Sequence, residues 1–216
     1  MKAMSKVLLL ALCAVLLVVS TVFATFAYLT STDSVKNTFT FGQVSITLDE
    51  ATVKTDGTII SGSDREKTDG RTGANTYHLI PGHMYTKDPT IHVSDDSEDC
   101  WLFVKLENGL KEIIKSDPEI PMSIEDQMTE KRNWTLIDQT NNIYAYNAIV
   151  SVSENAHIPV FDAFELTDNA EVQNYGSATI VVTAYAVQAD GFNDAKKTAV
   201  QNATDAWNAA FGNSSN

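Results

Sequence analysis

Hydrophobic and polar residues alternate with a period of two along most of this chain. In FGQVSITLD (41–49), Val44, Ile46 and Leu48 alternate with polar residues, as expected for a strand with one face on a core and the other in water. The same alternation, or a short apolar run between turn residues, predicts further strands at YHLI (77–80), PTIHVSD (89–95), CWLFVKLE (100–107), NWTLID (133–138), NIYAYNAIV (142–150), HIPVFDAFEL (157–166) and SATIVVTAYAVQA (177–189).

Three segments depart from this alternation. Residues 109–132 contain helix formers with apolar residues three or four apart, which predicts a short helical insertion. From Phe192 the apolar residues again recur every three or four positions, so we expect an amphipathic C-terminal helix over 192–211, ended by Gly212. Residues 51–76 are polar, rich in Gly, Asp and Thr, and without period, which indicates a hairpin tip or a mobile loop.

The number and spacing of the predicted strands indicate an all-β fold. Six to nine short strands with few helices and regular turns are typical of an antiparallel sandwich. We therefore predict a jelly-roll-like sandwich that forms a single domain over residues 28–216, with the helical insertion and the C-terminal helix added to it.

The first 27 residues have the three parts of an export signal. Lys2 and Lys6 precede an apolar run over residues 7–23, and small residues follow up to Ala27, after which a signal peptidase could cut. The apolar run has 17 residues, near the lower limit for spanning a bilayer, so an uncleaved membrane anchor is the alternative. In both cases we expect residues 28–216 to lie outside the cytoplasm, as a secreted or surface-tethered protein.

The chain is strongly acidic, with a formal net charge of −13. Two of its 15 basic residues lie in the predicted signal, so the rest of the chain has 13 basic against 28 acidic side chains. Such a surface repels phosphate backbones, and no basic stripe offsets it, so we expect no nucleic-acid binding. Anionic membrane surfaces are disfavoured for the same reason, and the only membrane contact expected is through an uncleaved signal.

The two cysteines exclude an internal disulfide once the signal is removed. Cys13 lies in the predicted signal, which leaves Cys100 alone. Cys100 has apolar neighbours two positions apart, which favours a buried strand position over a reactive thiol. The fold must then be held by packing, and a chain of about 190 residues can bury roughly 70% of its unfolded surface.

The main candidates for chemistry are the histidines and an acidic loop. No HExxH or GxSxG motif is present, so no catalytic residue and no cofactor is assigned. His78 and His83 bracket the turn LIPG and His92 follows in the next predicted strand, which makes these three candidates for a zinc site. The acidic loop DDSED (95–99) is a candidate calcium site, with a solvated loop that keeps sheet edges apart as the alternative.

Four stretches in a fixed order carry a family resemblance: AYLTSTDSVKNTFTFGQVSITLDE (27–50), LIPGHMYTKDPTIHVSDDSEDCWLFVKLE (79–107), PVF (159–161) and AYAVQADGF (184–192) before a Trp-containing helix. Together they resemble the TasA/camelysin family of secreted proteins from Gram-positive bacteria. The resemblance implies cleavage by a SipW-type signal peptidase, a jelly roll of two antiparallel sheets, and a role in biofilm matrix fibres or on spores. It also implies an alternative, since camelysin is described as a cell-surface zinc metallopeptidase. Residues 51–76 and 109–132 match no family motif, and no metal ligand is carried over.

Two functions from different classes remain open. The first, which the export signal, the single β-rich domain and the resemblance favour, is a secreted fibre subunit that associates with itself. The second, which the resemblance implies, is a camelysin-like zinc metallopeptidase. A monomeric adhesin or envelope protein is a third possibility. For the fibre subunit, residues 28–41 are expected to act as an arm in which Phe39 and Phe41 alternate with threonines. Such an arm can add as a strand to the open edge of a neighbouring subunit.

The predicted cut site determines where the secreted protein begins. Because Ala27 provides the small side chain that a signal peptidase needs before the cut, secreted protein should begin within a few residues of Tyr28. N-terminal sequencing of secreted material measures this directly. Retention of Met1 in that material would show instead that the apolar run remains as an anchor.

Overall fold

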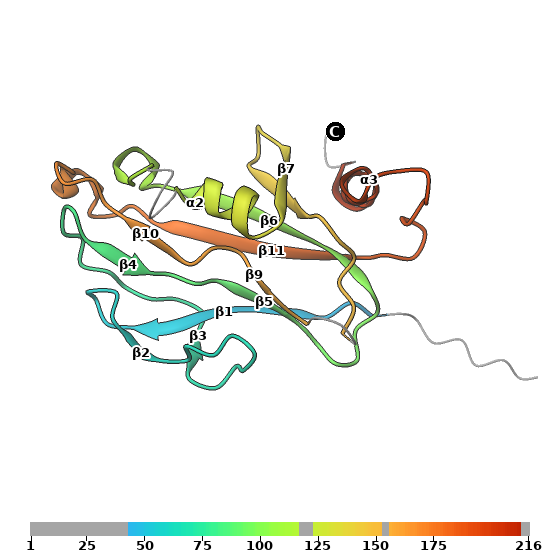
Figure 1. The fold of residues 1–216 in the computed structure, drawn as a ribbon, viewed down its shortest axis with the longest axis horizontal. Helices are drawn as coiled ribbons and strands as arrows, with labels where there is room; N and C mark the ends of the chain where they lie inside the picture. Colours follow the sequence, from blue (N-terminus) through green and yellow to red (C-terminus); the bar gives the residue numbers. More distant parts are fainter. Residues whose placement is uncertain (1–42, 117–122, 153–155, 213–216) are drawn as a thin grey trace, which may run out of the picture. The chain divides into compact units, whose positions relative to one another are not determined.

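The computed structural model describes residues 43–116, 123–152 and 156–212 (Figure 1). They belong to one compact unit, Gly42–Asn216. The predicted signal, its cleavage residue Ala27 and the arm residues Phe39 and Phe41 lie outside the described residues, as does the centre of the predicted helical insertion.

Antiparallel strands dominate the described residues, as the alternating sequence pattern predicts. One sheet has the order β2-β1-β5-β9, and β3 pairs with β1 as well. Its strands are β1 (Ile46–Val53), β2 (Ile59–Ser61), β3 (Arg71–Thr72), β5 (Thr90–Val93) and β9 (His157–Pro159).

A second sheet has the order β11-β6-β8-β7. Its strands are β6 (Cys100–Asn108), β7 (Trp134–Asp138), β8 (Ile143–Tyr146) and β11 (Ile180–Gln188). Two further strands, β4 (Met84–Thr86) and β10 (Ala163–Glu165), pair with each other. Every pairing is antiparallel, so the all-β class is confirmed, and the predicted hairpin of β7 and β8 is present.

The main hydrophobic core lies between the two large sheets. Leu102 and Val104 of β6 are fully buried in one cluster with Ile91 of β5 and Ile158 of β9. Each such side chain contributes roughly 1.5–3 kcal/mol through removal of its apolar surface from water. The first sheet therefore covers one face of the second, which makes a sandwich.

Helix α3 (Ala199–Phe211) covers the other face of the second sheet (Figure 1). Trp101 and Phe103, which alternate with the core residues of β6, are buried with Ala203 and Ala206 of this helix. Strand β6 thus lies in the middle of three layers. This explains why it is the most hydrophobic strand in the sequence.

The C-terminal helix begins later than its periodicity predicts. Thr198 is the N-cap, and its hydroxyl accepts from the backbone of Gln201 while the Gln201 side chain accepts from the backbone of Thr198. This capping box fixes the start of the helix, so the predicted start at Phe192 is wrong. Phe192 lies in a turn, where its carbonyl accepts from the Trp101 indole. Gly212 ends the helix as predicted.

Other predicted segments differ in detail. The insertion at 109–132 contains the 3₁₀ turn η1 (Lys111–Ile113), the short helix α2 (Ile124–Asp126) and the π turn η2 (Gln127–Lys131). A further 3₁₀ turn, η3 (Val172–Tyr175), precedes β11. YHLI (77–80) is not a strand, and the supposed loop at 51–76 holds the end of β1 together with β2 and β3. Across the described ranges, no helix has both the length and the apolar character to cross a membrane.

Cys100 is buried, as its neighbours in the sequence predict. It forms an isolated bridge with Val150, with backbone bonds in both directions. Burial, aided by the negative charge of Asp99, raises the pKa of its thiol to about 11. The thiolate is therefore scarce at neutral pH.

We expect Cys100 to resist thiol reagents while the protein is folded. In a chain that starts at Tyr28, which has no other cysteine, a disulfide-exchange dye at about pH 8 should label the thiol only after denaturant is added, since only the thiolate reacts. The rate of dye release measures this. Labelling of the native protein as fast as that of the denatured chain would contradict the buried position.

Candidate functional site

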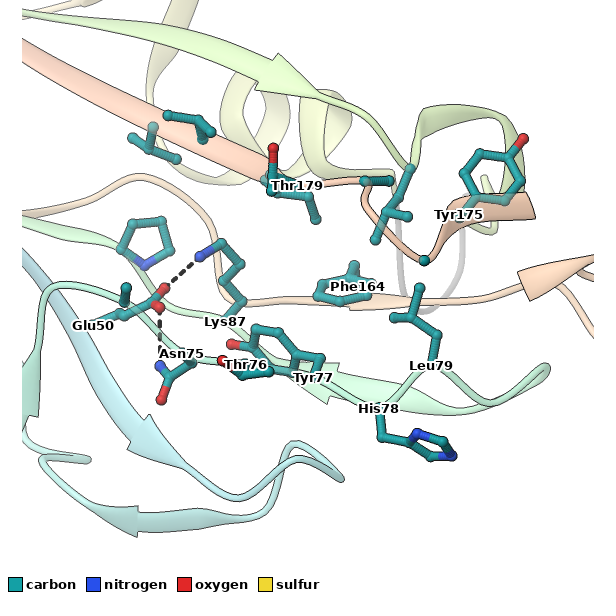
Figure 2. A pocket seen from close by; sticks show the side chains of 18 of the residues that line it. Glu50, Asn75, Thr76, Tyr77, His78, Leu79, Lys87, Phe164, Tyr175 and Thr179 are labelled. Atoms are coloured by element: carbon teal, nitrogen blue, oxygen red, sulfur yellow. Dashed lines mark hydrogen bonds and ion pairs between the residues drawn. The ribbon is translucent and has the colours of Figure 1, made fainter. Parts of the chain in front are cut away.

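A cavity of about 740 Å³ separates strand β11 from the segment 73–79 (Figure 2). Apolar side chains supply more of its wall than polar ones do, among them Leu48, Leu79, Phe164, Ile180 and Val182. Three polar groups, Glu50, Asn75 and Lys87, meet on one side of it (Figure 2). An apolar hollow with a few converging polar groups is the usual form of a binding site.

The upper wall of the cavity is the free edge of a sheet. Strand β11 pairs only with β6 among the strands of the described residues. Leu106 of β6 donates its N–H to the carbonyl of Asn142, on the side away from β11. Val182 lies opposite Leu106 on β11, so these two residues form a pair without hydrogen bonds between them. Because these pairs alternate along an antiparallel ladder, the backbone groups of Ile180, Val182 and Ala184 point toward the open edge.

Strand β11 itself carries none of the sequence features that usually protect an edge against pairing with another chain. Proteins normally blunt an exposed edge with charges, prolines, bulges or short length. Strand β11 is nine residues long, reads IVVTAYAVQ, and contains no charge and no proline. Val181 at its start is 41% exposed. The sequence of β11 therefore favours the addition of another strand.

On the polar side of the cavity, the side chains of Asn75 and Lys87 both bond to the carboxylate of Glu50. The Glu50 side chain is 5% exposed and that of Lys87 is 12% exposed, and Lys87 Nζ lies 2.6 Å from Glu50 Oε2. Asn75 Nδ2 donates to the other oxygen, Oε1, at 2.9 Å. Glu50 thus joins an amine and a carboxamide through its two oxygens (Figure 2).

The carboxamide of Asn75 is fixed by the backbone of β1. Its Nδ2 also donates to the carbonyl of Ala51 at 2.8 Å, and its Oδ1 accepts from the N–H of Val53 at 3.0 Å. Nearby, burial raises the pKa of Tyr77, and the charges of Glu50 and Asp88 add to the effect. The Tyr77 hydroxyl accordingly stays protonated and donates to the carbonyl of Thr86.

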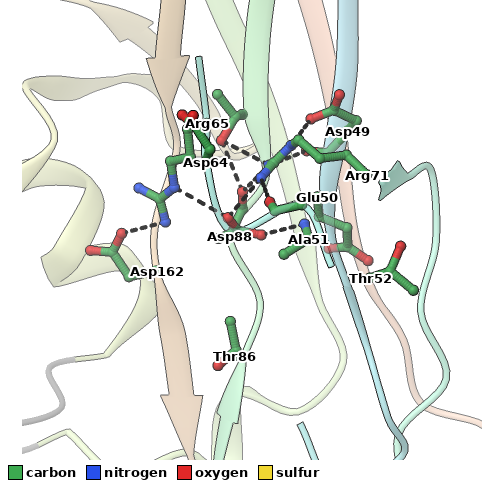
Figure 3. Close-up of polar contacts among 12 residues, drawn as sticks. Asp49, Glu50, Ala51, Thr52, Asp64, Arg65, Arg71, Thr86, Asp88 and Asp162 are labelled. Atoms are coloured by element: carbon green, nitrogen blue, oxygen red, sulfur yellow. Dashed lines mark hydrogen bonds and ion pairs between the residues drawn. The ribbon is translucent and has the colours of Figure 1, made fainter. Parts of the chain in front are cut away.

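A buried arginine organises the strands on the far side of Glu50 (Figure 3). The side chain of Arg71 is 0% exposed and forms ion pairs with Asp49 and Asp88. It also donates to the carbonyl of Gly62 at 2.6 Å and to the hydroxyl of Thr90 at 3.2 Å. Asp88 in turn accepts from the backbone of β1, at Ala51. The guanidinium thus binds β1, β3 and the start of β5 to one another.

The network continues toward the helical insertion. Arg65 bridges Asp88 and Asp162 (Figure 3). Arg132, at the end of the insertion, pairs with Asp162 too. Burial alone raises the pKa of Asp162, but the hydrogen bonds and charges of Arg132 and Arg65 outweigh it and lower that pKa overall. Ion pairs therefore connect segments that lie far apart in the sequence.

The structure places the three histidines suggested as metal ligands in separate settings. His78 is exposed, and His83 bonds to the carbonyl of Asp56 through Nε2 at 2.8 Å. His92 instead meets His157 on β9, with 2.7 Å between their Nδ1 atoms, while its Nε2 bonds to Asp49. Both ring nitrogens of His92 are thereby engaged. Within the described part of the chain, no three His, Cys, Asp or Glu side chains group so that they could hold a metal ion.

The residues that build this site were not evident from the sequence. Arg65 and Arg71 lie in the segment that was expected to be a loop, and their partners Asp88 and Asp162 lie far away in the chain. One feature of the sequence pointed to this network. Asp88 lies between Lys87 and a predicted strand, and an acidic residue that becomes buried beside a strand requires a cation as a partner.

No family model, curated protein or solved structure matches this chain.

We expect removal of the Arg71 guanidinium to unfold this end of the sandwich. Arg71→Met leaves Asp88 buried without one of its cations, and the loss of one partner of a buried pair costs about 3–5 kcal/mol. Lys67→Met is the matched control, because the Lys67 side chain is 70% exposed and its ion pair within the described residues is with exposed Asp64. Its effect should stay within about 1 kcal/mol. Denaturant unfolding followed by circular dichroism gives both values, and equal effects would contradict the role of Arg71.

Proposed function

We propose that this protein is a secreted structural subunit that assembles head to tail into extracellular fibres by strand addition. The observation that carries the proposal is the free edge of β11, which is long, uncharged and bordered by an apolar cavity. The localisation rests on the export signal in the sequence, and a SipW-type peptidase is the expected partner that cuts it. In this proposal the sandwich is a jelly roll.

The added strand is the arm at residues 28–41 of a neighbouring subunit. Its backbone pairs with the outward groups of Ile180, Val182 and Ala184, which supply affinity independent of side chains. Phe39 and Phe41 share one face of the arm and enter the apolar cavity, while the intervening threonines face solvent. The arm has more residues than the nine of β11, so it can cover the whole edge.

The geometry of this contact leads to a filament. The arm and the edge of β11 are different surfaces, so each subunit offers one and uses the other. Such contacts leave a free arm at one end and a free edge at the other, and growth continues. Cleavage after Ala27 is the trigger, because the signal otherwise holds the arm at the membrane. The family resemblance to biofilm matrix proteins agrees with this assembly.

Assembly should depend on the edge of β11 and on the arm. In a chain that starts at Tyr28, Val182→Pro removes an N–H that faces the open edge without touching the ladder to β6, and Val181→Lys adds a charge to the edge. Both variants should stay monomeric, as should a chain without residues 28–41 and the double variant Phe39→Asp, Phe41→Asp. Sedimentation and light scattering measure the fraction polymerised.

Leu136→Lys is the matched control. Leu136 is 38% exposed on β7, at the opposite edge of the same sheet, so this variant should form fibres as the wild type does. Equal polymerisation by the chain without its arm would overturn arm donation. Casein hydrolysis that stops with a chelator and returns with zinc would favour the metallopeptidase instead.

A further inference from the structure

The polar side of the cavity holds a nucleophile, an electrophile and a base in one hydrogen-bonded chain. Lys87 provides an amine, Asn75 provides a carboxamide, and the two oxygens of Glu50 hold one each at 2.6 and 2.9 Å. All three line the same cavity among apolar walls that include Tyr77 and Phe164 (Figure 2). An amine and an amide held by one carboxylate away from bulk water can exchange protons through it.

We propose that Lys87 and Asn75 form an intramolecular isopeptide bond, with Glu50 as the catalytic residue. The Lys87 ammonium gives a proton to the Glu50 carboxylate, and the neutral amine then attacks Cγ of Asn75. A bond forms between Nζ and Cγ, and the bond from Cγ to Nδ2 breaks. The two protons that the Lys87 nitrogen releases pass to Nδ2, which leaves as ammonium, and Glu50 ends as the carboxylate it was at the start. The step needs no oxidant, reductant or further reactant.

Each requirement of this step has a group in place. Glu50 contacts both the attacking nitrogen and the leaving nitrogen, as a proton shuttle between them must. The N–H of Val53 already bonds to Asn75 Oδ1 at 3.0 Å, where negative charge develops during attack, so it acts as an oxyanion donor. The contacts to Ala51 and Val53 hold the carboxamide still, and the amine reaches Cγ by rotation of the flexible four-carbon stem of Lys87.

The bond would close the chain on itself around the cavity wall. It joins the segment 73–79 to the residue that follows β4, and the closed loop contains the turn at Pro81 and Gly82 and the whole of β4. A crosslink of this kind restricts the unfolded chain, as a disulfide does. This chain has only one cysteine outside its predicted signal, so the isopeptide bond supplies a covalent tie that cysteine chemistry cannot.

A tryptic map of the full chain tests the proposal. No lysine or arginine lies between Arg71 and Lys87, so an unlinked chain releases the peptide Thr72–Lys87. The crosslinked chain cannot be cut at Lys87, and it should release Thr72–Lys105 with a mass one ammonia below that of the intact sequence. Fragmentation should then place the link between Asn75 and Lys87.

Two variants serve as controls. Glu50→Gln keeps both reacting groups but removes the base, and Lys87→Arg keeps a cation for Glu50 but removes the amine, so both should give a chain that is cut at position 87 with no loss of ammonia. A succinimide at Asn108 also loses ammonia, but it lies in the peptide after Lys105 and survives both substitutions. Release of unmodified Thr72–Lys87 from folded wild-type protein overturns the proposal, even if neither variant folds. The same crosslink in Glu50→Gln would overturn the role of Glu50.

Discussion

The buried guanidinium of Arg71 is the constraint on which this end of the molecule depends. Desolvation of a charge is costly, and two carboxylates with further oxygen acceptors offset that cost here. The partners lie on β1 and just before β5, so satisfying the cation fixes where β3 lies against β1. The segment 73–79 follows β3 directly and forms the lower wall of the cavity. A charge pair thereby determines the shape of an apolar hollow.

The two sheets supply the other half of that hollow. Strand β6 is covered on both faces, by the first sheet and by α3, and it pairs with β11 along the whole length of that strand. Strand β11 itself has no fully buried residue, although its inward side chains contact the main core. Among the described residues, β11 therefore has a paired inner edge and an outer edge with no strand beside it.

The sequence predicted the elements whose formation depends on residues a few positions apart. Strand β6 and the β7–β8 hairpin follow from alternation and turn residues within a few positions, and Gly212 marked the end of α3. Arg71 was missed because burial of a cation depends on partners 17 and 22 residues away. YHLI has the composition of a strand, but its backbone bonds to Thr55 and to the Tyr85 hydroxyl instead of a ladder. The capping box at Thr198 was a local signal that apolar periodicity obscured.

The register between β6 and β11 has a mechanical consequence. From Ile180 opposite Asn108 to Gln188 opposite Cys100, the nine pairs run without a bulge. A tension applied along β11 stretches all the ladder bonds together, so they share the load, whereas a force that peels the strand from one end breaks them in turn. A chain pulled lengthwise through this strand would yield only at high force, whereas one pulled sideways would lose its ladder bonds one after another at a lower force.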